Sequence, residues 1–372
     1  MKTAVWCFVA ACVAVALAPV RAQTAHASTC EGLTALNLGH VTITSARTVT
    51  TGTFALPEDA PRNDPAFFSS FEKLPAFCRV QAVSKPSAGS YIEFEVWLPS
   101  FTWNGKYVGA GNGGYGGSIN YYRLAEAVNG GYMGSSTDTG HRGRMAARRD
   151  VSIDFDYRAI HETAEQSKAI MRVFYGQGPT RSYFHSCSNG GRQAITEAER
   201  YPNDYDGISA GAPSFTNRIS PHADVSNAKL NAFKARGGKL LLYHGEKDGP
   251  EPSVKYYLRL ISTMGQRAAD EFVRLYVIPE MGHCGGGPVP EFGTRLWPAA
   301  PDAQHSIILA LERWVERGIA PDAIVGTKYR TDDDPTSGVE RTRPLCRYPQ
   351  RAVWNGKGSP DDASNYACIQ NP

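Results

Sequence analysis

The chain has 372 residues, of which 42% are apolar and 20% charged, and its formal net charge is +3. Such a composition can fill one large core or two ordinary ones, which excludes an intrinsically disordered chain. A nearly neutral charge without a long lysine or arginine run argues against nucleic acid as a partner.

The first residues have the pattern of a secretory signal peptide. Lys2 gives a positive start, and residues 4–20 (AVWCFVAACVAVALAPV) form an apolar run. A cleavage position with small residues follows, ending at Ala22. The run is too short for a transmembrane helix, and no other segment approaches membrane length. We therefore expect a signal peptide over 1–22, a secreted or periplasmic protein, and no membrane partner.

The cysteine count indicates disulfides. The chain has eight cysteines, and two of them, Cys7 and Cys12, fall in the signal region, which leaves six. An even number in an exported chain predicts disulfides, and six cysteines allow fifteen pairings. None are spaced as CxxC, so a zinc or thioredoxin-like site is not indicated. The most economical pairing is Cys30–Cys78, Cys187–Cys284 and Cys346–Cys368.

Strand and helix patterns alternate along the remaining chain. Apolar or alternating runs predict strands at 91–99, 106–111, 131–141, 181–186, 205–213, 238–248 and 272–284. Helical spacing predicts helices at 158–176, 190–202 and 305–318, with Gly176, Pro202 and Gly318 as ends. The tail from Gly326 is expected to be loop-like. This alternation predicts an α/β fold with a mostly parallel sheet covered by helices.

Residues that can carry chemistry lie at the turns or loops in which three predicted strand segments end, where parallel sheets form their sites. Residues 186–190 (SCSNG) fit a loosened G-x-S-x-G nucleophile elbow around Ser188. Asp248 and His283 follow in the order serine, acid, histidine that is expected of an α/β-hydrolase. Each taken alone has an ordinary structural explanation as a turn or loop residue.

The chain has nine histidines, and the cysteines distinguish His283 from the other eight. A Cys187–Cys284 bridge would hold its Cα atoms about 4.4–6.8 Å apart. Ser188 and His283 are each one residue from that bridge, so it would bring them within hydrogen-bonding reach. A purely structural bridge is the alternative. The main competing histidine is His141; the others considered are His185 and His244 in predicted strands, and His161, His222 and His305 on helix or loop.

A glycine-rich stretch, GAGNGGYGG (109–117), follows an early strand. Hydrolases carry an oxyanion loop at this point, because glycines let backbone N–H groups approach a substrate oxygen. We expect the donors to be the N–H of Asn189 and that of Gly113 or Gly114. The stretch lacks the lysine of a P-loop and the spacing of GxGxxG, so phosphate binding is not indicated. No cofactor or metal is expected.

Four segments together resemble the tannase/feruloyl esterase family, which also contains the enzyme that hydrolyses mono(hydroxyethyl) terephthalate. They are residues 187–213, GNGGYGG, GYMGSSTDTGH and GHCGGG, and the resemblance runs from about Cys30 to Cys368. It implies a secreted α/β-hydrolase that acts on esters of aromatic acids, such as feruloyl, galloyl or terephthaloyl-like esters. By the match, Ser188 is the nucleophile, His283 the base and Asp248 its orienting acid, with Cys187–Cys284 as the family's bridge.

The chain departs from the family between the serine and the acid. Family members usually carry a large lid there, often with a calcium site and extra cysteines. Here the segment 214–238 contains no cysteine and no Asp-rich calcium loop, so the calcium site does not carry over. We expect one catalytic domain over 30–372, with 214–238 as a vestigial lid and 326–372 as a disulfide-tied tail. The site should be more open and less selective.

Two hypotheses from other functional classes remain beside that of a serine esterase. A catalytically silent protein on a hydrolase scaffold would keep the fold and the bridges but bind its ligand unchanged. A metal-dependent hydrolase would use Asp138, His141 and His161, and chelators would inhibit it. A third alternative within the esterases is a general short-chain carboxylesterase with an open site. The acyl group, the alcohol and the oligomeric state are not indicated by the sequence.

Overall fold

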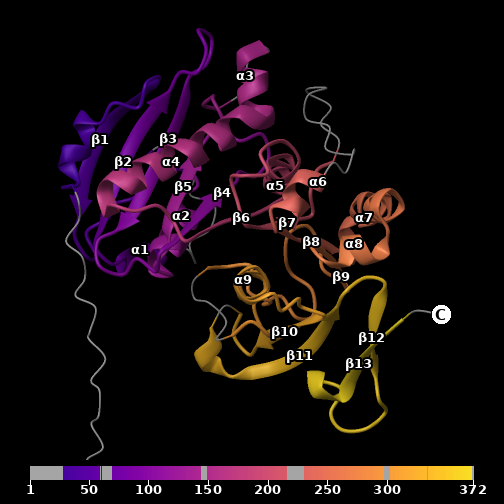
Figure 1. Ribbon diagram of the computed structural model, residues 1–372. Coiled ribbons are helices and arrows are strands. Elements are labelled where there is room, and N and C mark those ends of the chain that lie inside the picture. The colour runs from indigo at the N-terminus through magenta and orange to yellow at the C-terminus, as the bar shows by residue number, and fades with distance from the viewer. Residues whose placement is uncertain are drawn as a thin grey trace, which may run out of the picture.

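The computed structural model describes residues 28–58, 60, 69–143, 149–215, 230–296, 302–332 and 334–370. Through these residues runs a nine-stranded sheet in the order β1-β2-β3-β5-β4-β6-β7-β8-β9 (Figure 1). Strands β4 to β9 are parallel, whereas β1, β2 and β3 join antiparallel. The strands are β1 Val41–Val49, β2 Phe77–Ser84, β3 Ile92–Pro99, β4 Lys106–Ala110, β5 Met133–Thr137, β6 Arg181–Cys187, β7 Gly207–Gly211, β8 Lys239–Gly245 and β9 Val273–Ile278.

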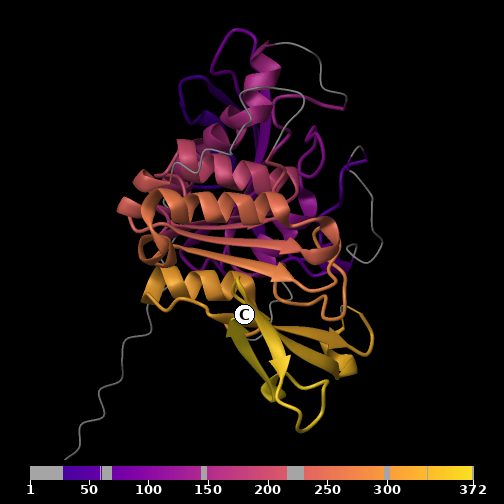
Figure 2. The ribbon, with the colours of Figure 1, turned by 90° about the vertical axis from the view of Figure 1, so that its right-hand side faces the viewer.

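Helices cover both faces of this sheet, as the sequence predicts. In Figure 2, the orange α7 and the gold α9 lie on opposite sides of the strands. The helices are α1 Ser69–Glu72, α2 Tyr121–Asn129, α3 Arg149–Ile153, α4 Ala159–Tyr175, α5 Asn189–Arg200, α6 Asn231–Ala235, α7 Glu251–Met264, α8 Gln266–Asp270 and α9 Ile307–Arg317. The predicted helix ends at Gly176 and Gly318 are confirmed, because both glycines take the left-handed conformation that closes a helix.

The core follows from the alternation of side chains along the central strands. In β8, Leu240 and Leu242 pack with the apolar faces of α4, α5 and α7. Leu241 and Tyr243 point to the other face and pack with α9. A strand buried on both faces reads as a continuous apolar run, which is why the central strands could be predicted.

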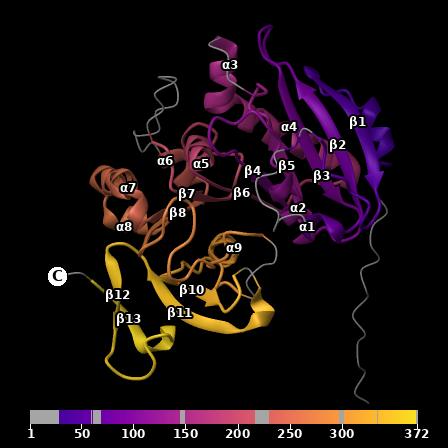
Figure 3. The ribbon, with the colours of Figure 1, turned by 180° about the vertical axis from the view of Figure 1, so that it is seen from behind.

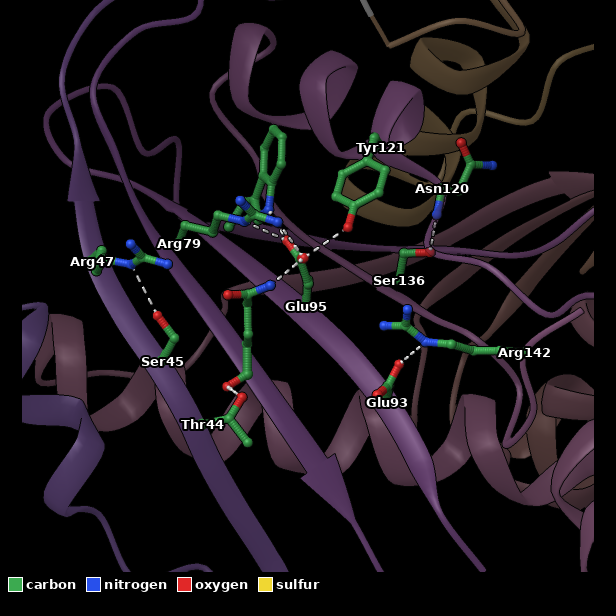
Figure 4. Close-up of polar contacts among 12 residues, drawn as sticks. Thr44, Ser45, Arg47, Arg79, Glu93, Glu95, Asn120, Tyr121, Ser136 and Arg142 are labelled. Atoms are coloured by element: carbon green, nitrogen blue, oxygen red, sulfur yellow. Dashed lines mark hydrogen bonds and ion pairs between the residues drawn. The ribbon is translucent and has the colours of Figure 1, made fainter. Parts of the chain in front are cut away.

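An N-terminal extension of the sheet was not predicted. β1 and β2 form an antiparallel pair, and a register shift between Ile43 and Ser45 interrupts the alternation that marks a strand in sequence. Next to this pair, the buried carboxylate of Glu95 on β3 accepts hydrogen bonds from Arg79, Tyr121, Gln81 and Trp97 (Figure 4). These bonds satisfy a charge that would otherwise be costly to bury, and they fix the start of α2 against β3.

The expectation of a loop-like tail is wrong. The tail forms two two-stranded sheets, from β10 Ala323–Tyr329 with β11 Val339–Cys346, and from β12 Gln350–Trp354 with β13 Tyr366–Gln370. Figure 3 shows them beside α9, far from β1 to β3. The N–H of Tyr348 donates to the carbonyl of Leu275 at 2.7 Å, so the tail docks on β9 and covers the edge of the large sheet.

Some expectations lie wholly or partly outside the described residues. The proposed signal peptide does, and so do residues 216–229 of the proposed vestigial lid. The described ends of that lid segment belong to the core, since Phe215, Leu230 and Phe233 are buried in it. In the described part of the chain, no helix combines the length and the apolarity needed to cross a bilayer.

Candidate active site

Ser188, Asp248 and His283 all lie at one edge of the sheet. Strands β6, β8 and β9 are parallel, and each of the three residues follows the carboxyl end of one of them. Only β7 separates β6 from β8. Open parallel sheets form their sites at this edge, because the loops that leave neighbouring strands meet there.

The backbone at Ser188 has the geometry of a nucleophile elbow. Ser188 has φ 65° and ψ −125°, immediately before α5. A residue with a Cβ adopts such angles only at a cost of about 1–3 kcal/mol, so the surroundings must hold it there. The Ser188 N–H donates to the carbonyl of Gly211 at 2.9 Å, and its own carbonyl accepts the N–H groups of Arg192 and Ser214. Three hydrogen bonds therefore fix the strained residue.

Close contacts explain the two glycines after the serine. A Cβ at Gly190 would lie 1.9 Å from the Oγ of Ser186, and one at Gly191 would lie 2.3 Å from the carbonyl oxygen of Gly211. Neither position has room for a side chain. The small residue Ser186 and the two glycines let α5 start directly beneath the turn, as the elbow pattern predicts.

The three side chains form a continuous hydrogen-bonded chain. The Oγ of Ser188 lies 2.8 Å from Nε2 of His283, and Nδ1 of His283 lies 2.7 Å from Oδ2 of Asp248. These distances let the serine hydroxyl donate to a neutral imidazole whose Nδ1–H donates to the carboxylate. The side chain of His283 is 54% exposed, so a ligand can reach it from solvent.

The cysteine pairs in the structure are those the sequence indicates. Cys187 and Cys284 are bridged, with their Cα atoms 5.9 Å apart. The bridge joins the end of β6 to the loop that follows β9, so it ties the residue before Ser188 to the residue after His283. Cys284 also has a positive φ of 66°, which shows how sharply this loop turns at the bridge. The other two bridges are Cys30–Cys78 and Cys346–Cys368.

A second imidazole contacts Asp248, and the sequence reasoning missed it. Nε2 of His244, near the end of β8, lies 3.1 Å from the same Oδ2 that His283 contacts. On its other side, Nδ1 of His244 lies 2.7 Å from the Oγ of Ser253 in α7. Burial is the main cause that lowers the pKa of His244, so its ring is neutral at neutral pH. The available signal was the spacing in HGEKD, a histidine four residues before the acid.

The glycine-rich loop lies against the elbow. Asn112 anchors it: its N–H donates to Oε1 of Gln193 in α5, and its side-chain amide donates to the carbonyl of Thr137. The far end is held where the N–H of Asn120 donates to Ser136 (Figure 4). Between these anchors, no atom lies within 4 Å of the place a Cβ would take at Gly113 or Gly114. The loop therefore presents bare backbone to open space beside α5.

Tyr115 is the aromatic residue of this loop. It belongs to a turn in which the N–H of Gly116 donates to the carbonyl of Gly113 at 3.1 Å. Its side chain is among the most exposed large apolar groups of the described residues, at 65%. The turn begins directly after Asn112, so the uncovered ring belongs to the loop that Asn112 anchors on α5. The sequence pattern predicts an oxyanion loop here but gives no separate role to Tyr115.

Within the described residues, the other histidines considered from the sequence have hydrogen-bond partners other than Ser188. His185 is buried in β6 and contacts the carbonyl of Thr294, and burial lowers its pKa to about 3. His305 pairs with Asp302, and His222 lies outside the described residues. His141 contacts Thr139 in the loop after β5.

The residues of the metal-site alternative do not come together as one cluster. In the described part of the chain, the one group with metal-ligand potential combines His161 with Glu165 and Asp204, and contains neither Asp138 nor His141. Asp138 accepts the backbone N–H groups of Glu93 and Gly140, and burial raises its pKa to about 8. These bonds shape the loop after β5, so Asp138 serves the fold there.

A cavity of about 670 Å³ opens next to the bridge. Its wall includes Cys284 and the glycines 285–287, which directly follow His283. Charged side chains from distant parts of the chain complete it, among them Arg123, Glu126 and Lys328. The cavity is thus a polar space whose wall includes the residues that directly follow His283 in sequence.

Fold and site together define an α/β-hydrolase. Comparison with known proteins identifies the family within this class. The sequence model of the tannase and feruloyl esterase family matches residues 78–217 and 216–369. The chain belongs to this family, and it is a carboxylic ester hydrolase. The chain is 28% identical to an uncharacterised esterase of Xanthomonas campestris pv. campestris, over 94% of this chain and 92% of the relative. It is 25% identical to a protein described as probable feruloyl esterase B-2 of Aspergillus terreus, over 78% and 86%.

Solved structures show the same fold. The crystal structure of feruloyl esterase B from Aspergillus oryzae superposes with a TM-score of 0.79 at 23% identity, over 91% of this chain and 99% of that one. Tannin acyl hydrolase from Aspergillus niger superposes with a TM-score of 0.70 at 16% identity, over 94% and 97%.

The comparisons also bear on the short segment after β7. The Xanthomonas alignment uses 94% of 372 residues, about 350, yet runs over 543 positions. About 190 positions of the relative therefore have no counterpart here. The two pieces matched by the family model meet at residues 216–217. This is the pattern expected if the chain lacks, at that point, a long segment that its relatives carry.

Proposed function

We propose that the protein is an exported serine esterase that cleaves esters of aromatic acids with Ser188, His283 and Asp248. One observation carries the proposal: in a member of an ester-hydrolase family, Ser188, His283 and Asp248 are joined by hydrogen bonds of 2.8 and 2.7 Å at the carboxyl edge of the sheet. This arrangement suits a hydroxyl nucleophile, a general base and an acid that orients the base.

In this mechanism Ser188 attacks the ester carbonyl while His283 takes its proton. The tetrahedral intermediate collapses as His283 returns that proton to the leaving alcohol, and an acyl-enzyme remains. Water then attacks the acyl group, again with His283 as base, and releases the acid. The negative charge of Asp248 stabilises the imidazolium that forms in both halves of the reaction.

The backbone N–H of Asn189, with that of Gly113 or Gly114, would bind the oxyanion. Two observations support this assignment: Asn189 is the first residue of α5, and the glycine loop lies against that helix through Asn112 and Gln193. A helix N-terminus favours negative charge, and bare backbone can approach the substrate closely. The polar cavity whose wall includes Cys284, the residue after His283, would offer room for the leaving alcohol.

Export is supported by the N-terminal signal pattern of residues 1–22 and by the three disulfides. Disulfides persist in oxidising compartments and are rare in the cytosol. We therefore propose a secreted or periplasmic location.

A fluorophosphonate probe tests the proposed nucleophile directly. We expect one probe per chain, attached to the peptide that contains Ser188, because a serine activated by an imidazole attacks the phosphonate. Intact-protein mass and peptide mapping measure this. An active preparation that takes up no label, or takes it up elsewhere, would contradict the assignment.

A panel of feruloyl, galloyl, terephthaloyl and short aliphatic esters separates an aromatic-acid esterase from a general short-chain esterase.

Aromatic selectivity should depend on Tyr115, the exposed ring of the glycine-rich loop that Asn112 anchors on α5. Replacing Tyr115 with Leu should raise KM for methyl ferulate by about 2- to 10-fold, because ring–ring contact contributes about 0.5–1.5 kcal/mol. KM for an ester without a ring, such as methyl butyrate, should stay unchanged. The matched control is Phe101→Leu, which removes a ring that is 69% exposed beyond the end of β3, at the opposite edge of the sheet. Equal effects on both esters would exclude this role for Tyr115.

A further inference from the structure

The sequence does not predict the contact between His244 and Asp248, and this contact has no part in the proposed reaction. His244 is buried, with 4% of its surface exposed. Its Nε2 lies 3.1 Å from Oδ2 of Asp248, the oxygen that also contacts His283. Two imidazoles thus converge on one carboxylate oxygen, and only one of them reaches the serine.

The hydrogen bonds around His244 determine which ring nitrogen carries its proton. A neutral imidazole has one donor and one acceptor nitrogen. Nε2 faces a carboxylate, which only accepts, so Nε2 must be the donor. Nδ1 must then accept, and the hydroxyl of Ser253 at 2.7 Å can donate to it. Ser253 is fully buried in α7, so this donor stays in place.

The resulting arrangement is consistent from one end to the other. Ser253 donates to His244, and His244 donates to Asp248. From the other side, Ser188 donates to His283, and His283 donates to Asp248. Every group donates one hydrogen bond toward the carboxylate. A carboxylate held by two donors keeps its oxygen in one position, which a residue on a short turn after a strand would not otherwise guarantee.

The protonation state of His244 matters as much as its position. Burial, the largest cause, lowers its pKa, although Asp248 acts in the opposite direction. A neutral His244 orients Asp248 without neutralising it. The full negative charge of the carboxylate therefore remains available when His283 becomes an imidazolium. A charged His244 would form an ion pair with Asp248 and compete with His283 for it.

We propose that His244 is a positioning residue for catalysis, which acts through Asp248 and whose tautomer Ser253 sets. The inference rests on the proposed function of Ser188, His283 and Asp248. It assigns no contact between His244 and the substrate. Its effect should therefore appear in kcat and not in KM.

The test compares two replacements of His244. His244→Phe removes the N–H that donates to Asp248. We expect kcat to fall by about 10- to 100-fold with KM unchanged, since small displacements of a catalytic group have effects of this size. Gln offers an N–H near the position of Nε2 and a carbonyl that can accept from Ser253. His244→Gln should therefore keep kcat within a few-fold of wild type. Ser253→Ala should lower kcat several-fold, because the Nδ1–H tautomer then becomes accessible.

The matched control is the same pair of changes at His161. Nδ1 of His161 lies 2.6 Å from Asp204, so it is also an imidazole paired with an aspartate, on α4 and without contact to Ser188. His161→Phe and His161→Gln should leave kcat unchanged. A fall in kcat in His161→Phe as large as that in His244→Phe would show a general effect of losing an imidazole–aspartate pair, and it would overturn the inference.

A double-mutant cycle separates positioning from a general effect on the fold. In an Asp248→Ala background, adding His244→Phe should change the rate of fluorophosphonate labelling by less than about 2-fold, because effects that run through one residue are not additive.

Three outcomes would overturn the inference. They are a wild-type kcat in His244→Phe, a His244→Gln variant that is stable but as slow as His244→Phe, and a full further loss of the labelling rate in the Asp248→Ala background. If Ser188→Ala were still active, the proposed function would fail first; a dead Ser188→Ala with a fully active His244→Phe would remove this inference alone.

Discussion

Replacing Ser188 with Ala is expected to lower kcat/KM for p-nitrophenyl acetate and methyl ferulate by at least about 10⁴-fold. Loss of the nucleophile of a Ser-His-Asp triad has effects of this order, and the residual rate comes from binding and oxyanion stabilisation alone. The change removes one oxygen and leaves the backbone bonds of residue 188 intact, so circular dichroism and the melting temperature should stay those of wild type. A folded Ser188→Ala protein that still hydrolyses either ester would refute the assignment.

Ser188→Gly extends this prediction from activity to stability. Residue 188 is held at φ 65°, a conformation that Gly adopts without the steric cost that a Cβ imposes. The Gly variant should therefore be inactive but melt at a higher temperature than Ser188→Ala. That outcome would show that strain is retained at the elbow for catalysis, whereas equal melting temperatures would show that the surrounding bonds impose no measurable strain.

Removal of the Cys187–Cys284 bridge is expected to have the second-largest effect. The bridge spans 97 residues of sequence and would contribute about 4–5 kcal/mol to stability in the chain-entropy model. It also ties the serine turn to the histidine loop. We expect the double variant Cys187→Ala/Cys284→Ala to lose at least 10-fold in kcat/KM even below its melting temperature, because modest misplacement of a catalytic group is costly.

The matched control removes the bridge in the tail. Cys346→Ala/Cys368→Ala opens a bridge that spans 22 residues and lies away from the site, so stability should fall while kcat/KM stays at the wild-type value. Circular dichroism melts and steady-state kinetics on both variants measure the two effects separately. If the two variants lost activity equally, the bridge beside Ser188 would have no role beyond stability.

The central part of the fold could be predicted because its signals are local. Strands such as β4 and β8 are largely buried on both faces and have apolar runs, and the glycines after α4 and α9 mark helix ends. The outer parts could not be predicted in this way. The register shift in β1 breaks the alternation, and the short strands of the tail depend on docking at Leu275 of β9, a contact between residues far apart in the chain.

In the site, too, some residues could be predicted from the sequence and others could not. Ser188, Asp248 and His283 could be selected because their chain order and the adjacent cysteines carry information about distance. The pairing of His244 with Asp248 depends on how the turn after β8 folds back toward the strand, and that of His244 with Ser253 depends on how α7 packs. A sequence pattern records the spacing of such residues but not the direction of their side chains.

The segment between β7 and β8 has a further consequence for the changes of length that this chain can tolerate. It leaves and re-enters the sheet at adjacent strands whose register is fixed, from Gly207 opposite Lys239 to Gly211 opposite Tyr243, and the Cys187–Cys284 bridge closes around it. Its length can therefore change with little effect on the catalytic edge, since doubling a loop costs only about 0.6 kcal/mol. We expect a chimera that carries a longer relative's segment at residues 216–217 to keep the arrangement of Ser188, Asp248 and His283, and with it the hydrolysis of p-nitrophenyl acetate.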